Sequence, residues 1–199
     1  QTISSTPRDV SFLYHYPESD DIKPAQKTYI QSYMFAFESA LYSSSFLDSS
    51  VGYRQYIDIN SFVDYYLLNE ATRNVDGYRI STFMYKNKDS KNNRLFIGPP
   101  WDYNLGWGNA DYCDGGLTTG WASDFNILCP GDNYQIPFWW LRMLSDSEFL
   151  NRLNCRWDEL RQGPFHTDSI NILIDSIGSM LSEPATRNFN TSTCPPSAA

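Results

Sequence analysis

The sequence predicts a mostly helical α+β fold with one antiparallel β-hairpin near its centre. Apolar residues recur at helical spacing in the first and last thirds of the 199-residue chain. Between them, two segments rich in β-forming residues flank the short polar turn 87–92. Apolar residues make up 41% of the chain, which is ample for a packed core, and we predict a single domain over residues 1–199.

A short strand and a long helix are predicted first. The segment FLYHYP (12–17) contains β-forming aromatic residues and ends on a proline, which favours an edge strand. Pro24 suits the first turn of a helix, and apolar residues recur after it at helical spacing as far as Leu41. We therefore predict a strand at 12–17 and a helix at about 24–45.

A second helix is predicted to lead directly into a turn. Asp58 or Asn60 can cap its N-terminus, and apolar residues at helical spacing continue to about Arg73. The segment NVDG (74–77) favours a turn, because Asn, Asp and Gly tolerate turn conformations. This order places Asp76 just before the first predicted strand of the hairpin.

The segments YRISTFMYK (78–86) and NRLFIGP (93–99) are predicted to pair as the hairpin. Asp76 precedes the first of them and Asp102 follows the second, at equal sequence distances from residue 89. If the strands pair about that residue, the two carboxylates emerge side by side, since paired strands lie about 4.8 Å apart.

Two carboxylates at that spacing repel each other unless a proton or a cation lies between them. Mg²⁺ takes oxygen ligands, and Asn104 offers an amide oxygen two residues beyond Asp102. Such a site suits phosphoryl transfer, in which one carboxylate orients the attacking hydroxyl and the other holds the metal. Arg79 and Lys86 are nearby cations for phosphate, although strand alternation puts them on opposite faces. Aspartates that only shape turns, and a glycosidase pair, remain alternatives.

A long loop and further helices complete the chain. Residues 105–135 are rich in Gly, Asp, Asn and Thr and have little periodicity. Ser145 and Glu148 form a capping-box pattern, and residues 183–199 are predicted to be an irregular tail. Three further helices are predicted, at 136–144, at about 146–162 and from Thr167 to about 182.

Four cysteines favour two disulfides and an oxidising compartment. We prefer the pairs Cys113–Cys129 and Cys155–Cys194, because the first would close the glycine-rich loop. The sequence allows three connectivities, and four reduced thiols are the alternative. A structural zinc site is disfavoured, since no two cysteines have CxxC spacing and the chain has two histidines.

The charge and the apolar pattern exclude several classes of protein. A net charge of −8 disfavours binding to nucleic acid. No segment approaches the roughly 18 apolar residues of a membrane span. The first residues have no signal-peptide pattern, so we expect the chain to begin after processing or partway through a larger multidomain polypeptide. An acidic chain of this kind fits an extracellular or cell-surface protein.

Three motifs in order make residues 56–112 resemble the CotH kinase family, named for spore-coat protein H. They are SFVDYYLLNE (61–70), NVDGYRIS (74–81) and GPPWDYN (98–104). The resemblance is clear over about 12–125. It implies a protein-kinase-like fold of which this chain is the C-terminal lobe, with the hairpin bearing the active-site loops. By this resemblance, we expect the family's N-terminal lobe, which carries the nucleotide-clamping strands, to be absent from this chain.

The resemblance also implies an activity: an atypical secreted kinase that transfers phosphate from ATP to serine in a protein, with Mg²⁺ or another divalent cation. Asp76 takes the catalytic role and Asp102 the metal-binding role. Asn104, where many members have Asp, is a further ligand for the metal and the nucleotide, and Arg79 a phosphate contact. The alternative is a catalytically inactive cell-surface module that binds a glycan or a protein on the same scaffold.

Overall fold

The structure, a computed structural model, describes residues 2–3 and 10–190. The chain divides into two compact units, residues 1–154 and 155–199, which we describe separately. Helices predominate and the longer antiparallel pair is a central hairpin, which confirms the predicted α+β class. One domain over 1–199 stays a prediction.

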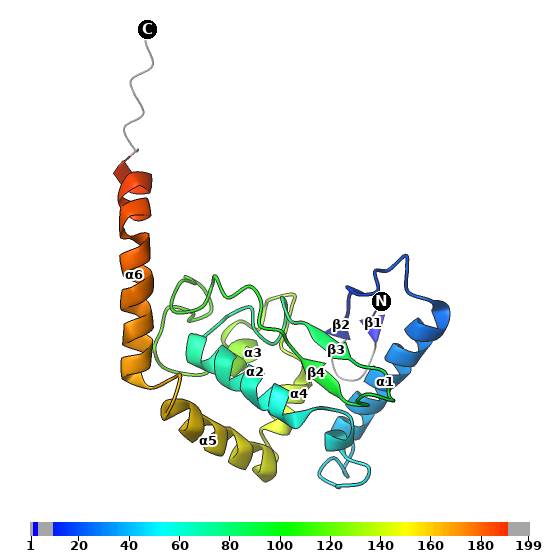
Figure 1. Cartoon of the computed structure of the whole chain (residues 1–199). Coiled ribbons are helices and arrows are strands. Elements are labelled where there is room, and N and C mark those ends of the chain that lie inside the picture. Colours follow the sequence, from blue (N-terminus) through cyan, green and yellow to red (C-terminus); the bar gives the residue numbers. More distant parts are fainter. Residues whose placement is uncertain (1, 4–9, 191–199) are drawn as a thin grey trace. The chain divides into compact units, whose positions relative to one another are not determined.

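The first unit combines helices with two small antiparallel sheets (Figure 1). The hairpin lies between α1 and α2, and α4 packs against α1. The strands are β1 (Thr2–Ile3), β2 (Val10–Ser11), β3 (Met84–Lys86) and β4 (Leu95–Ile97). The helices are α1 (Pro24–Tyr42), η1 (Tyr53–Gln55), α2 (Ile59–Thr72), η2 (Ala122–Asp124), α3 (Phe125–Leu128), α4 (Phe138–Met143) and α5 (Ser147–Arg161), which continues into the second unit.

Helix α2 begins and ends as its sequence predicts. The Asp58 carboxylate caps its N-terminus by accepting a 2.9 Å hydrogen bond from the amide of Ser61. Arg73 ends it in the left-handed conformation, with φ of 47°. The chain therefore turns sharply at the point where the NVDG segment begins.

The strands differ from the prediction in position and length. Residues 12–17 form no strand, and β2 lies just before them at Val10–Ser11, where it pairs with β1. In the hairpin, Met84 pairs with Ile97 and Lys86 with Leu95, which puts the centre of the turn between residues 90 and 91. Pairing stops before either aspartate, because Gly98 and two prolines follow β4.

The core of the first unit is built around Trp140 of α4. Its side chain is 1% exposed. Its ring lies 5.8 Å from Phe62 and 6.0 Å from Tyr65, both on α2. Its closest ring neighbour is Tyr78, at 4.8 Å. Trp140 thus packs α4 both on α2 and on the segment that follows Asp76.

A buried carboxylate fixes the start of α5. The capping residue is Asp146, whose Oδ1 accepts from the amide of Glu148 at 2.9 Å, while the Ser145 hydroxyl donates to a carbonyl of α4. The predicted Ser145 cap is therefore wrong. Asp146 Oδ2 accepts hydrogen bonds from the Tyr53 hydroxyl at 2.7 Å and from Arg54 at 2.7 and 2.9 Å. This residue joins α5 to η1.

We expect the Asp146 cluster to make the first unit sensitive to acid. Burial alone raises the pKa of Asp146, but hydrogen bonds from Tyr53 and Arg54 outweigh burial and hold this pKa below its ordinary value. The stabilisation is therefore present above the unfolded-state value of about 3.9 and is lost as the pH falls through the lower folded-state value. Urea unfolding from pH 7 to pH 2 measures this loss.

The matched variant is Asp146→Asn, which removes the titrating group and keeps its shape. It is expected to be less stable than wild type at pH 7 by about 1.5–3 kcal/mol. The difference between the two proteins should shrink below about pH 4, as the wild-type carboxyl is protonated first in the unfolded chain and, at lower pH, in the folded protein. A constant difference at every pH would contradict this account.

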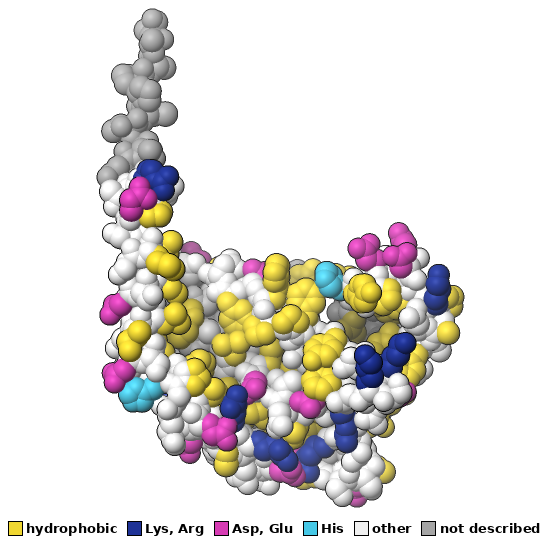
Figure 2. Space-filling model, in the orientation of Figure 1, with side chains coloured by type: hydrophobic (Ala, Val, Ile, Leu, Met, Phe, Trp, Pro, Cys, Tyr) yellow, Lys and Arg dark blue, Asp and Glu magenta, His cyan; other side chains and the backbone are white. Residues whose placement is uncertain are grey.

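In the second unit, α6 (Thr167–Asn190) is longer than predicted. Residues 183–190, predicted as part of an irregular tail, are helical even though Pro184 lies inside the helix. Apolar side chains are exposed along α6 (Figure 2). They are Ile172, Leu173, Ile174, Ile177, Met180, Leu181 and Phe189. Within the described residues, none of the helices combines the length and apolar character needed to cross a bilayer.

Candidate active site

The turn after α2 holds Asp76 through its own backbone. The amide of Asp76 donates to Asn74 Oδ1 at 3.3 Å, and the amide of Gly77 donates to the carbonyl of Asn74 at 3.0 Å. The carbonyl of Asp76 accepts from the amide of Ile80 at 3.1 Å. Gly77 packs directly on α2, since a Cβ there would lie 2.1 Å from Asn69 Oδ1. The NVDG segment is thus a tight turn in which only glycine fits at the fourth residue, Gly77.

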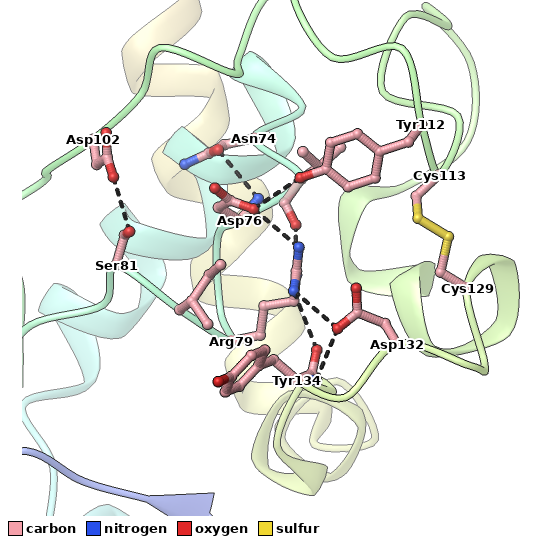
Figure 3. Close-up of polar contacts among 12 residues, drawn as sticks. Asn74, Asp76, Arg79, Ser81, Asp102, Tyr112, Cys113, Cys129, Asp132 and Tyr134 are labelled. Atoms are coloured by element: carbon pink, nitrogen blue, oxygen red, sulfur yellow. Dashed lines mark hydrogen bonds and ion pairs between the residues drawn. A yellow bond between two sulfur atoms is a disulfide. The ribbon is translucent and has the colours of Figure 1, made fainter.

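The carboxylate of Asp76 is held through one of its two oxygens (Figure 3). Oδ1 accepts hydrogen bonds from Arg79 Nη2 at 2.9 Å and from the Tyr112 hydroxyl at 3.0 Å. Its side chain is 13% exposed. From the part of the chain that the structure describes, Oδ2 receives no hydrogen bond. This oxygen is therefore free to accept a proton from a ligand.

Arg79 is buried and its guanidinium is surrounded by protein groups. The side chain is 3% exposed. Besides Asp76, it donates to the carbonyl of Val75 at 2.8 Å and to Asp132 Oδ1 at 3.3 Å. The guanidinium also lies over the ring of Phe125, 4.0 Å from its centre. These contacts orient Arg79 toward Asp76, and its assignment to a nucleotide phosphate stays a prediction.

Tyr112 reaches Asp76 from the long loop, directly before a disulfide. Cys113 and Cys129 are bonded, with their Cα atoms 5.8 Å apart, which confirms the predicted pair. Burial and then the hydrogen bond to Asp76 raise the pKa of the Tyr112 phenol, so that it stays a proton donor at neutral pH. The second predicted pair stays a prediction, because Cys194 lies outside the described residues; Cys155 is exposed.

Asp102 lies on a different segment, after β4, and has its own partner. Its Oδ2 accepts a 3.0 Å hydrogen bond from the Ser81 hydroxyl (Figure 3). Both residues have left-handed backbones, with φ of 63° for Asp102 and 51° for Ser81. Non-glycine residues in this region are strained, and such strain is concentrated at functional sites. The hairpin ends before this contact, so loop packing brings Ser81 to Asp102.

Asp102 and Asn104, the predicted magnesium ligands, both lie on the segment after β4, and their role as ligands stays a prediction. Both residues are exposed, and the main-chain carbonyl of Asn104 accepts a hydrogen bond from the side chain of Asn109 at 2.7 Å. Among residues 2–3 and 10–190 no group of three or more His, Cys, Asp or Glu gathers as a metal site. Mg²⁺ needs no such cage, because it is commonly bound by one or two carboxylates together with substrate phosphates and water.

Comparison with protein-family models gives one decisive match. The model described as CotH kinase protein matches residues 3–195, which is nearly the whole chain. The chain belongs to the CotH kinase family. Comparison with curated proteins and with solved structures found no match.

The segment SFVDYYLLNE also contains a half-buried carboxylate, Glu70, that supports the loops around the candidate site. Glu70, the last residue of this motif, accepts hydrogen bonds from the Tyr78 hydroxyl at 2.8 Å and from the amides of Ala122 and Ser123 at 2.7 and 2.9 Å. Burial raises the pKa of Glu70 in spite of these hydrogen bonds, which lower it. Glu70 therefore joins α2 to Tyr78, in the segment after the NVDG turn, and to η2. Its place at the end of SFVDYYLLNE was the feature of the sequence that could have predicted this role.

Lys86, the second predicted cation, is at the far end of the hairpin and is already paired. Its ammonium forms an ion pair with Asp89 and lies over the rings of Tyr29 and Tyr33 at 5.1 and 4.7 Å. The lysine side chain is 3% exposed. These contacts hold the hairpin against α1. They account for the burial of the Lys86 side chain, so that no phosphate ligand is needed to explain it.

Proposed function

We propose that this CotH family protein is an ATP-dependent phosphotransferase whose acceptor is a serine hydroxyl of another protein. The observation that supports this best is the carboxylate of Asp76. One of its oxygens is fixed by Arg79 and Tyr112, and the other has no partner among the described residues. This is the arrangement that a group needs to take a proton from an acceptor hydroxyl.

In the proposed reaction Asp76 acts as the base. Its Oδ2 accepts the hydrogen bond of the serine hydroxyl and orients the oxygen toward the terminal phosphorus of ATP. As the bond from the serine oxygen to this phosphorus forms, the bond from the phosphorus to the bridging oxygen of ADP breaks, ADP leaves, and Oδ2 takes the hydroxyl proton. Arg79 and Tyr112 keep Oδ1 in place, so that the carboxylate does not rotate away from the acceptor. Because Arg79 is buried among Val75, Phe125 and Asp132, it acts through Asp76.

Asp102 and Asn104 would hold the divalent cation. Mg²⁺ supplies charge that neutralises the phosphate oxygens of the nucleotide during transfer. The hydrogen bond from Ser81 fixes the direction of the Asp102 carboxylate and leaves its Oδ1 for a ligand. No Lys or Arg occurs between residues 95 and 141. The cations that contact phosphate beside Asp102 and Asn104 would therefore come from outside their segment, which fits a C-terminal lobe working with an N-terminal lobe of a larger polypeptide.

The disulfide supports an extracellular or cell-surface location. Cys113 and Cys129 are both partly accessible, and such bonds persist in oxidising compartments. Secretion is thus part of the proposal, together with a protein substrate encountered outside the cell.

The test is phosphate transfer from γ-labelled ATP, with the full-length protein, dephosphorylated casein and the protein itself as acceptors. We expect incorporation that requires Mg²⁺ and is abolished by EDTA. Asp102→Asn should raise the Mg²⁺ concentration needed for half-maximal rate by about tenfold or more, because one anionic ligand is lost. Absence of incorporation by the wild-type protein would refute the proposed activity.

A binding module is the second candidate, and the exposed tryptophans favour it. Trp101, Trp107 and Trp121 are 61%, 67% and 58% exposed. They flank the loops that carry Asp102 and η2, and exposed aromatic rings are typical of surfaces that bind glycans or proteins. Tight binding of a glycan array by a wild-type protein that transfers no phosphate would select this candidate.

A further inference from the structure

The loop closed by the Cys113–Cys129 disulfide supplies several of the groups that surround the Asp76–Arg79 pair. Tyr112, next to the first cysteine, donates to Asp76 at 3.0 Å. Asp132, three residues beyond the second, accepts from Arg79 at 3.3 Å. The carbonyl of Tyr134 accepts from the same guanidinium at 3.3 Å. Figure 3 shows these groups converging on Asp76 and Arg79 from the side that carries the disulfide.

The distances along the chain make the disulfide important for this arrangement. The cysteines are 16 residues apart, and Tyr112 and Asp132 lie just outside them, so the bond holds both contacts close together. Without the disulfide, Tyr112 and Asp132 would be connected only through a loop of about twenty residues. Opening that loop would gain conformational entropy, which would oppose the two contacts. Inside the loop, η2 and α3 are short helices with few backbone hydrogen bonds of their own, and the amides of Ala122 and Ser123 donate to Glu70 of α2. The disulfide and Glu70 thus hold different parts of the loop, and the disulfide is the one next to Tyr112 and Asp132.

We propose that this loop, residues 112–134, is a positioning device for Asp76 and that reduction of the Cys113–Cys129 disulfide releases Asp76 from its fixed orientation. Tyr112 and Asp132 are positioning residues, since they act through Asp76 and Arg79. The catalytic consequence rests on the proposed function, whereas the structural coupling does not. In the reduction, a dithiol transfers two electrons and two protons to the disulfide, which becomes two thiols while the dithiol becomes a cyclic disulfide.

Hydrogen exchange of the full-length protein tests the coupling without requiring activity. Amides of 74–80 are bonded within the turn, including Gly77 to Asn74 and Ile80 to Asp76. On reduction with dithiothreitol, exchange should rise by about tenfold in 74–80 as well as in 112–134, while the hairpin strands β3 and β4 stay protected. The double variant Cys113→Ser/Cys129→Ser should behave like the reduced protein.

Two results would overturn the proposal. Faster exchange in 112–134 with unchanged exchange in 74–80 would show that the loop does not position Asp76. An equal rise over 74–80, α2 and the hairpin would show that the disulfide stabilises the whole unit and has no local role. Tyr112→Phe, which keeps the ring and the disulfide, should still raise exchange in 74–80, and the exposed Tyr85→Phe should not.

The activity of the same variants separates this inference from the proposed function. Tyr112→Phe should lower kcat by about tenfold and leave the KM for ATP unchanged, because the hydroxyl contacts the carboxylate. A wild-type rate in Tyr112→Phe, when the wild-type protein is active, would overturn the catalytic part. An inactive wild-type protein would instead refute the proposed function, and the exchange experiment would still decide the coupling.

Discussion

Replacement of Asp76 by asparagine is expected to lower kcat for phosphate transfer by about 10²- to 10⁴-fold. Asparagine keeps the size of the side chain and can still accept from Arg79 and Tyr112 through its amide oxygen. It cannot take a proton from the acceptor hydroxyl. The KM for ATP should change little, because Asp76 is proposed to contact the acceptor and not the nucleotide. Steady-state rates with labelled ATP measure both quantities.

The matched control is Asp111→Asn. Asp111 is an exposed aspartate that directly precedes Tyr112 in the long loop. Its replacement should leave kcat within about twofold of wild type, in line with the small effects of surface substitutions. A comparable rate in Asp76→Asn and Asp111→Asn would remove Asp76 from the mechanism.

The largest effect on stability is expected from Trp140→Ala. The side chain is 1% exposed and contacts the rings of Phe62, Tyr65, Tyr66 and Tyr78. Removing a buried tryptophan loses its burial and leaves a cavity, which together cost about 3–5 kcal/mol. That is a large fraction of the total stability of a typical domain. Urea unfolding followed by circular dichroism gives the free energy of unfolding.

Leu141→Ala provides the comparison on the same helix. Leu141 is 79% exposed, so its truncation should change the free energy of unfolding by less than about 0.5 kcal/mol. Equal losses for the two variants would contradict the position of Trp140 in the core. Because Tyr78 follows Asp76 by two residues, Trp140→Ala should also speed hydrogen exchange in 74–80.

The sequence predicted the local structure best where the signals were local. Pro24 marked the start of α1, and Asp58 capped α2 as expected, because both act through the backbone of their own helix turn. The prediction of the cap of α5 was wrong, because two adjacent residues could both have capped that helix. Asp146 replaced Ser145 as the cap of α5, since Asp146 also bonds Tyr53 and Arg54, which are more than ninety residues away in the chain.

The candidate site shows the same division. The sequence by itself selected Asp76 and Asp102, through turn chemistry and the resemblance to the CotH family, and it preferred the Cys113–Cys129 pair. It placed the two aspartates by extending the hairpin, and the strands stop earlier. The tertiary structure alone decided the partners, Tyr112 for Asp76 and Ser81 for Asp102. Side-chain contacts between distant segments depend on how loops pack, and no periodicity in the sequence records that packing.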